Sequence, residues 1–195
     1  QSRIIIQVFN SGMSCPAQRL PPWLRVPYRG SRVRSHVHQV LRELNLHTVC
    51  ESAQCPNQCE CWERGTATFM IMGGTCTRNC RFCAVDHGEP PALLEDEPQR
   101  VAEAVAALGL RFVVVTSVTR DDLPDGGAAH FARTVRAVRE RCPEAGVEIL
   151  TPDFFGKKEH VVTVLDGKPT VFNHNIETCR RLTAQIRSGA DYDRS

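Results

Sequence analysis

Three cysteines in the stretch GGTCTRNCRFC, residues 73–83, are spaced C-x3-C-x2-C. Thiolates at such short spacing bind soft metal ions or iron–sulfur clusters. A structural zinc and an ordinary [4Fe–4S] cube each take four protein ligands, whereas Cys76, Cys80 and Cys83 supply three. A cube held by three thiolates leaves one iron open, as a catalytic zinc leaves one position open. The motif therefore predicts a cluster that binds a substrate or cofactor at its free iron.

The position of the motif supports this interpretation. The apolar run ATFMIMG, residues 67–73, is typical of a buried strand, and the cysteines follow its carboxyl end. Sheets of α/β proteins place their ligands at that end. The alternative is a zinc site completed by a histidine such as His87, but a zinc knuckle does not need a strand-end position.

The chain of 195 residues contains ten cysteines, and seven of them lie between Cys50 and Cys83. A secreted disulfide scaffold would distribute its cysteines along a short, loop-rich chain. This pattern favours metal binding in a reducing compartment. Cys15, Cys142 and Cys179 stand outside any motif, and we interpret them as ordinary free thiols.

Apolar and turn residues predict alternating strands and helices after residue 66. The expected strands span 67–73, 111–118, 146–153 and 170–176, and the expected helices span 97–109, 127–142, 157–167 and 177–187. Four strand–helix units of this kind form a parallel sheet covered by helices, either doubly wound or an arc of a barrel. A further helix is expected over 37–50, where Val37, Val40, Leu41 and Leu44 follow helical spacing.

The 24 basic and 22 acidic residues give a net charge of +2, which provides no reason to expect nucleic acid or a membrane surface as partner. No apolar run approaches the roughly 20 residues that span a bilayer. Residues 1–14 match no pattern found downstream, and we expect them to form a disordered leader. Residues 16–30 are rich in Pro and Arg, which favours an extended arm.

C-x3-C-x2-C after the first strand of an α/β arc resembles the radical S-adenosylmethionine (SAM) superfamily. The resemblance implies that the amino acid end of SAM chelates the open iron. It also implies that Phe82, the aromatic residue before the last cysteine, lies near the adenine, although plain loop packing would explain this residue equally well.

A second cysteine group, CESAQCPNQCEC at 50–61, contains C-x4-C-x5-C and narrows the resemblance. Together with RLPPWLRVP, VTSVTRDDLPDGGA, PDFFGKKE and VFNHNIET, it is similar to the lipoyl synthase family over roughly residues 19–195. This similarity implies that Cys50, Cys55 and Cys61 hold an auxiliary [4Fe–4S] cluster, which is consumed as the source of sulfur. Cys59 falls at a position that the spacing leaves free, so we interpret it as a bystander, with substitution for a neighbour as the alternative.

Polar residues after the second and fourth strands are further candidates for SAM binding. Arg120, Asp121 and Asp122 follow the strand 111–118 and could hold the amino group and ribose, although acidic loops with Pro and Gly are usually turns. In NHN, Asn173 and Asn175 share one face of the strand and are candidate lining residues. His174 points the other way and is more typical of a structural group.

The resemblance implies insertion of two sulfur atoms at C6 and C8 of a protein-bound octanoyl group. An electron from ferredoxin or flavodoxin would lead to cleavage of SAM into methionine and a 5′-deoxyadenosyl radical, which removes each hydrogen. The cofactors would be two [4Fe–4S] clusters and SAM. The partners would be octanoylated carrier domains of 2-oxoacid dehydrogenase complexes and of the glycine cleavage system. The location would be the cytoplasm of a bacterium.

The resemblance further implies a domain division and a truncation. Residues 15–65 would hold the arm, a helix and the auxiliary-cluster segment, and 66–195 would form a partial (β/α) barrel with about four of six strand–helix units. The family continues past DYDRS to a serine that completes the auxiliary cluster, so we expect a chain truncated at its carboxyl end and impaired in sulfur insertion. The alternatives are another radical SAM sulfur-transfer enzyme and a non-catalytic iron–sulfur or zinc module.

Overall fold

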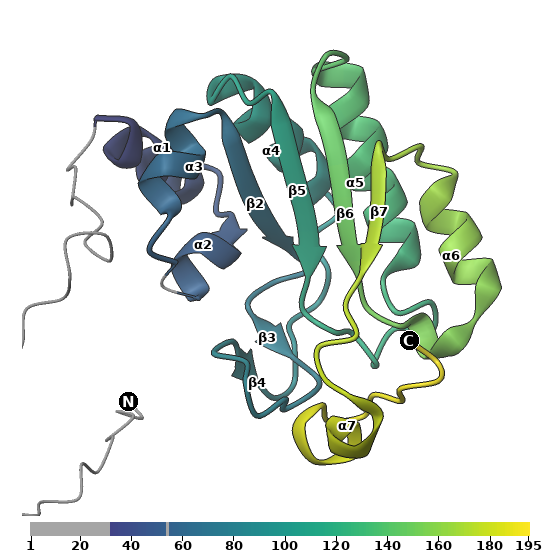
Figure 1. The fold of residues 1–195 in the computed structure, drawn as a ribbon. Helices are drawn as coiled ribbons and strands as arrows, with labels where there is room; N and C mark the ends of the chain where they lie inside the picture. The colour runs from purple at the N-terminus through teal and green to yellow at the C-terminus, as the bar shows by residue number, and fades with distance from the viewer. Residues whose placement is uncertain (1–31, 54) are drawn as a thin grey trace, which may run out of the picture.

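A five-stranded sheet forms the centre of the molecule in a computed structural model that describes residues 32–195 apart from residue 54 (Figure 1). The predictions for the leader and the Pro/Arg-rich arm lie outside the described residues. The strand order is β1 (His47–Thr48), β2 (Thr66–Ile71), β5 (Phe112–Ser117), β6 (Gly146–Thr151) and β7 (Val171–His174). β1 pairs with β2 in antiparallel fashion, and the other neighbours are parallel.

Three helices cover one face of this sheet. They are α4 (Glu97–Ala107), α5 (Ala128–Arg141) and α6 (Lys158–Leu165), and α4 and α5 lie behind the sheet in Figure 1. The four parallel strands follow one another in chain order, as expected for an arc of a barrel. β1 and β7 are the two edge strands, and within the described residues they do not pair to close the sheet into a barrel. The predicted α/β fold with a partial barrel is confirmed.

The two faces of the sheet differ because side chains alternate along each strand. Phe69, Val115 and Ile149 lie opposite one another in the register, face the helices and are at most 1% exposed. Each such side chain contributes about 1.5–3 kcal/mol by leaving water. The next residues, including Met70 and Thr116, face the opposite, open side. The helix-covered face therefore supplies the core, and the open face is available to ligands.

The helix predicted over 37–50 is wrong in its second half. α1 spans Arg32–Glu43 and then ends, because Asn45 adopts the left-handed conformation with φ of 48°. The N–H of Leu46 reaches back to the carbonyl of Leu41 at 2.9 Å, which closes the helix end in a Schellman arrangement. The apolar residues follow helical spacing through Leu44, but this spacing does not show that Asn45 ends the helix.

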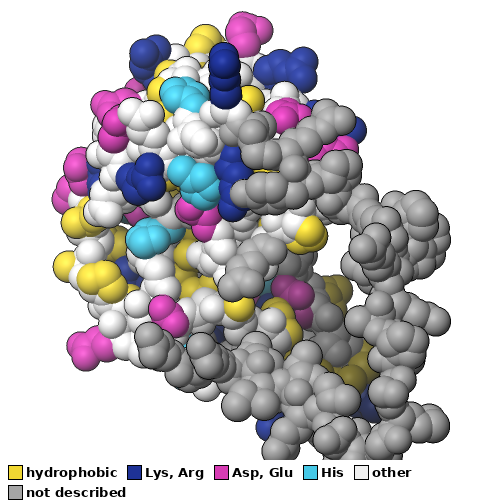
Figure 2. Space-filling model, turned by 90° about the vertical axis from the view of Figure 1, so that its left-hand side faces the viewer, with side chains coloured by type: hydrophobic (Ala, Val, Ile, Leu, Met, Phe, Trp, Pro, Cys, Tyr) yellow, Lys and Arg dark blue, Asp and Glu magenta, His cyan; other side chains and the backbone are white. Residues whose placement is uncertain are grey.

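The segment that follows α1 carries two short helices instead. Thr48 caps α2 (Val49–Ser52) by accepting the N–H of Glu51 on its side chain, and β1 extends the sheet beside β2. α3 (Gln58–Glu63) packs against α1 and β2. Figure 2 views the side of the molecule on which these helices lie, where basic and acidic side chains are interspersed with histidines.

The loops at the carboxyl ends of the strands form a second layer. A two-stranded sheet of β3 (Thr75–Cys76) and β4 (Asp86–His87) frames the cysteine motif, and η2 (Phe154–Gly156) follows β6. α7 (Arg180–Ile186) lies beside this loop layer rather than against the main sheet (Figure 1). The N–H of Arg81 donates to the carbonyl of Ile186 at 2.9 Å. The expectation that the fourth helix covers the sheet is therefore wrong, because its hydrogen bonds attach it to the cysteine loop.

Candidate functional site

A cavity of about 290 Å³ opens at the carboxyl ends of the parallel strands. Cys76, Cys80 and Cys83 all line it, and so does Phe82. Its other walls come from Met70 of β2 and from the residues that end β5, β6 and β7. The three cysteines predicted to act together therefore border one space, at the strand ends where the sequence placed them.

Backbone N–H groups lie close to two of the three sulfur atoms. Cys76 Sγ accepts the N–H of Arg78 at 3.4 Å and that of Thr119 at 3.3 Å. The N–H of Ser188, which follows α7, lies near Cys80 Sγ and favours its thiolate. Backbone donors of this kind stabilise thiolate ligands and tune iron–sulfur clusters. Burial, the largest effect, raises the pKa of Cys80, and the nearby Cys76 and Cys83 act in the same direction.

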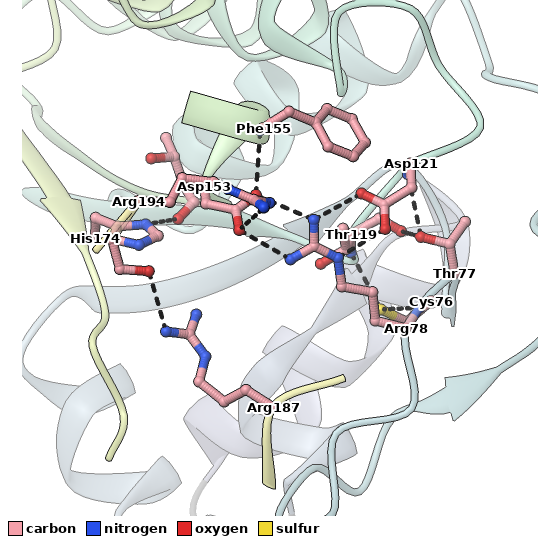
Figure 3. A network of polar contacts seen from close by, with 12 residues as sticks. Cys76, Thr77, Arg78, Thr119, Asp121, Asp153, Phe155, His174, Arg187 and Arg194 are labelled. Atoms are coloured by element: carbon pink, nitrogen blue, oxygen red, sulfur yellow. Dashed lines mark hydrogen bonds and ion pairs between the residues drawn. The ribbon is translucent and has the colours of Figure 1, made fainter. Parts of the chain in front are cut away.

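Arg78 connects this cysteine loop to two strand ends (Figure 3). Its guanidinium binds Asp121, after β5, with two hydrogen bonds of 2.7 and 2.9 Å, and Asp153, after β6, with two of 3.0 and 3.1 Å. Burial acts most strongly and would lower the pKa of Arg78, but the two carboxylates outweigh it and raise that pKa. A charged fork of this geometry fixes both partners in position.

The segment after α7 packs directly on Arg78. Gly189 adopts a φ of +68°, and a Cβ atom at this position would approach the Nε of Arg78 to 3.2 Å. A residue without a side chain is therefore suited to this contact. On the other side of the loop, Thr77 donates from both its N–H and its hydroxyl to the carbonyl of Thr119, at 3.1 and 3.0 Å. The cysteine loop is thus held from both sides.

The acidic loop after β5 uses its charges within the chain. Arg120 pairs with Asp122 at 2.8 Å and also donates to the carbonyl of Met72 at 3.3 Å. Hydrogen bonding to Arg120 lowers the pKa of Asp122. Together with Asp121, which binds Arg78, these residues lie outside the cavity lining. Their predicted contact with SAM stays a prediction, and the structure shows them supporting the loops around the cavity.

The residues predicted at the end of β7 separate into two groups. Asn175 lines the cavity and donates to Glu177 at 2.8 Å. Asn173 lies on the open face of the sheet, where it donates to Glu148 at 2.6 Å. His174 shares a hydrogen bond of 2.8 Å with the carbonyl of Thr151, as expected for a structural group.

Sequence reasoning missed several residues of this site. Arg78, Asp153 and Arg187 were not predicted, although Arg78 and Arg187 line the cavity. Nη1 of Arg187 donates to the carbonyls of Asn175 and Ile176, each at 3.0 Å. The position of Arg78 between Cys76 and Cys80 in the sequence could have identified it as a residue of the site. Arg187 had no comparable signal, because only the position of α7 brings it to the cavity.

The second cysteine group lies beside β2. Cys50 is 9% exposed, whereas Cys55 and Cys61 are half-buried. Burial, the largest effect, raises the pKa of Cys50, and Cys55 and Cys61 are near enough to raise it further. The backbone N–H of Thr68 lies near the Cys50 sulfur and acts to lower this pKa. Gln58 also donates from its side chain to the carbonyl of Cys50. These three cysteines are therefore neighbours in space.

Both cysteine groups lie beside β2. Thr68 contacts Cys50, and Met70, two residues further along the strand, lines the cavity that holds Cys76. Two residues of strand correspond to about 7 Å. Val49, the neighbour of Cys50 in the chain, also lines this cavity. Among residues 32–53 and 55–195, no three His, Cys, Asp or Glu side chains converge as a site for a single metal ion.

Comparison with known proteins agrees with this geometry. The sequence model of the radical SAM superfamily matches residues 70–195, which include the end of β2, the cysteine loop and the other three parallel strands. This chain belongs to the radical SAM superfamily. Membership implies a [4Fe–4S] cluster and SAM as cofactors. As a radical SAM protein, the chain offers Cys76, Cys80 and Cys83 as the ligands that would fit this cluster.

Residues 10–55 of this radical SAM protein match the N-terminal domain of lipoyl synthase of the radical SAM family. The chain is 53% identical over 190 residues to a lipoyl synthase of Symbiobacterium thermophilum, covering 97% of this chain and 59% of that protein. It is 56% identical over 178 residues to a lipoyl synthase of Pyrobaculum arsenaticum, covering 90% and 60%. The chain thus spans about three fifths of the length of these relatives. In the described part of the chain, no helix is both long and apolar enough to cross a membrane.

Proposed function

We propose that this protein is a lipoyl synthase, which inserts sulfur at C6 and C8 of an octanoyl group on a carrier protein. The observation that carries the proposal is the position of two cysteine triads beside the same strand, β2. A cavity lined by Cys76, Cys80 and Cys83 lies near a group of Cys50, Cys55 and Cys61, since Val49, the chain neighbour of Cys50, is part of the cavity wall. The identity with lipoyl synthases supports the same assignment.

The residues present fit two clusters. Cys76, Cys80 and Cys83 would hold the cluster that binds SAM. All three line a cavity, and the Cys76 sulfur accepts two backbone N–H groups. Cys50, Cys55 and Cys61 would hold the auxiliary cluster. When bound, the first cluster and SAM supply a radical that removes hydrogen from unactivated carbon, and the second cluster supplies sulfur.

The cavity walls provide contacts for the two ends of SAM. Arg187 is a cation on this wall, and among the described residues only its Nη1 is found in hydrogen bonds. Its remaining N–H groups suit a carboxylate, because a guanidinium binds carboxylates in a planar fork. Phe82, 53% exposed on the same wall, offers an aromatic face to the adenine.

Apolar residues on the open face would hold the octanoyl chain and exclude water. Val49, Met70 and Leu150 line the cavity from α2, β2 and β6. A reactive radical must meet its target carbon before solvent, so the residues that surround the reacting carbon must keep water out. No acid or base among these residues is assigned a proton transfer, because a side chain cannot deprotonate an unactivated methylene.

The partners in this proposal follow from its chemistry. The substrate would be an octanoylated carrier domain of a 2-oxoacid dehydrogenase complex or of the glycine cleavage system, and the reductant a low-potential carrier such as ferredoxin or flavodoxin. A cytoplasmic location is part of the proposal, since free thiolates at both triads require a reducing compartment.

The test follows hydrogen from substrate to product. The protein is reconstituted anaerobically with iron and sulfide and incubated with dithionite, SAM and a carrier domain bearing a perdeuterated octanoyl group. We expect 5′-deoxyadenosine that contains deuterium, detected by mass spectrometry. A carrier bearing a perdeuterated acetyl group should give no labelled product. Formation of 5′-deoxyadenosine without label from the octanoyl carrier would contradict the proposed substrate.

A further inference from the structure

Trp62 is a buried residue of α3 and directly follows Cys61, the third cysteine of the auxiliary triad. It is 4% exposed. The ring of His38, on α1, meets it edge-on, with centroids 5.4 Å apart and planes at 86°. Aromatic pairs favour this geometry, so packing accounts well for the carbon surface of the indole. Packing does not account for its polar atom.

The indole Nε1 of Trp62 makes no hydrogen bond to any described atom of the chain. A buried N–H without an acceptor is costly, because the group loses its hydrogen bond to water and gains nothing in return. A phenylalanine would fill similar apolar space without this cost. Such a donor in a native core calls for an explanation, and one explanation is an acceptor that the polypeptide itself does not provide.

The Cys50 sulfur is the polar atom near this donor. The Trp62 side chain and the N–H of Thr68 both stabilise the Cys50 thiolate, although burial has the larger, opposite effect. The indole of Trp62 is close enough to favour the Cys50 thiolate, but its N–H does not meet the geometry of an ordinary hydrogen bond to that sulfur. The indole N–H is thus close to a cluster ligand and still able to bond to a further acceptor.

We propose that the N–H of Trp62 donates a hydrogen bond to a sulfur atom of the auxiliary cluster held by Cys50, Cys55 and Cys61. The inference rests on the proposed function, because that function requires a cluster at this triad. Trp62 is then a positioning residue, which acts on the reaction through the cluster. Sulfur is an acceptor, and hydrogen bonds to it are one of the main means by which proteins set the potential of a cluster.

The direction of the effect follows from charge. Reduction makes the cluster more negative, so a donated hydrogen bond stabilises the reduced form and raises the reduction potential. The same hydrogen bond also helps to keep the sulfur atoms within the cluster and so slows its breakdown. Loss of the N–H should therefore lower the potential of the auxiliary cluster and hasten its breakdown, while the cluster at Cys76, Cys80 and Cys83 keeps its potential and serves as an internal reference.

The experiment compares the reconstituted parent protein with Trp62→Phe. The potentials of both clusters are measured by redox titration followed by electron paramagnetic resonance, and iron release to a chelator is timed. We expect a lower potential for the auxiliary cluster only, with its iron released roughly threefold to tenfold faster. Phe131→Leu, in the core on α5 and far from both triads in the sequence, is the control for general loss of packing and should shift neither potential.

A second variant separates the N–H from the shape of the ring. The chain with Trp23→Phe is produced with β-(3-benzothienyl)alanine in place of tryptophan, so that sulfur replaces the N–H of residue 62. Compared with Trp23→Phe that contains ordinary tryptophan, this protein should show the same fall in auxiliary-cluster potential and the same faster iron release as Trp62→Phe shows compared with the parent. Unchanged potentials and release rates in this isostere would overturn the inference. A parent protein that binds iron only at Cys76, Cys80 and Cys83 would instead overturn the proposed function, and this inference with it.

Discussion

Arg78 lies in the cysteine loop and donates two hydrogen bonds, of 3.0 and 3.1 Å, to the carboxylate of Asp153. The Arg78 side chain is 7% exposed and that of Asp153 is 1% exposed. The pair joins the loop between Cys76 and Cys80 to the end of β6. Asp153 also orders its own loop, because its carboxylate accepts the N–H of Phe155, which has a φ of 55°.

Replacement of Arg78 should destabilise the protein strongly. Arg78→Met leaves the buried Asp153 carboxylate with Arg194, at 3.3 Å, as its remaining charged partner among the described residues, and removing one member of a buried pair costs about 3–5 kcal/mol. The measurement is urea unfolding of the iron-free protein. Arg81→Met, at an exposed arginine of the same loop, should change stability by less than about 0.5 kcal/mol. Equal losses from the two variants would contradict a specific role of the pair.

The same pair predicts a dependence on pH. Burial acts most strongly and would raise the pKa of Asp153, but hydrogen bonds and charge from Arg78 outweigh it and hold the pKa below its ordinary 3.8. A depressed pKa gives stability that is complete above the unfolded value and lost as pH falls through the folded value. The stability difference between the parent and Asp153→Asn should therefore be constant near neutrality and shrink below about pH 4.

Asp96→Asn serves as the control for this pH series, because the Asp96 side chain is 70% exposed. Its stability difference from the parent should stay small throughout. If the stability difference between Asp153→Asn and the parent stays the same down to pH 3, the charge of Asp153 does not contribute to folding.

The two cysteine triads should bind iron independently. After anaerobic reconstitution, iron should approach about eight atoms per chain, as two cubes require. Replacement of Cys76, Cys80 and Cys83 by Ala should leave about half, because Cys50, Cys55 and Cys61 are held beside β2 by separate contacts. Iron and sulfide analysis measures this. A triple variant that retains all its iron would refute the assignment.

Cys59 should be dispensable for cluster binding. It lies on α3 and lines a surface pocket with Cys55, His38 and Glu51. The C-x4-C-x5-C spacing leaves it outside the auxiliary triad. Cys59→Ala should therefore keep the iron content of the parent, whereas Cys55→Ala should lower it. If both variants lose equal amounts of iron, the predicted register of the triad is incorrect.

The sequence predicted the elements that carry periodic patterns and missed those that depend on tertiary contacts. The helices and strands after residue 66 occur within a few residues of their expected bounds, because their apolar spacing records a buried face. Asn45 ends α1 early through a backbone conformation that no periodicity reveals. Likewise, the sequence did not reveal that the carboxylate of Asp121 binds Arg78, 43 residues away in the chain. The predicted contact of Asp121 with SAM stays a prediction.

Arg187 provides the final prediction, since its position at the cavity depends on the placement of α7. The carbonyls of Asn175 and Ile176 occupy Nη1, and the rest of the guanidinium is proposed to bind the SAM carboxylate. Hydrogen bonds to a charged group are worth about 1.5–3 kcal/mol, so Arg187→Gln should weaken SAM binding by roughly 10- to 150-fold. Equilibrium dialysis of the reconstituted protein with labelled SAM measures this. Arg180→Gln, on the same helix with its side chain 63% exposed and paired with Asp193, is the control and should bind SAM as the parent does. Arg187→Gln with parental SAM affinity and full iron content would exclude a SAM contact and leave Arg187 as a brace for the end of β7.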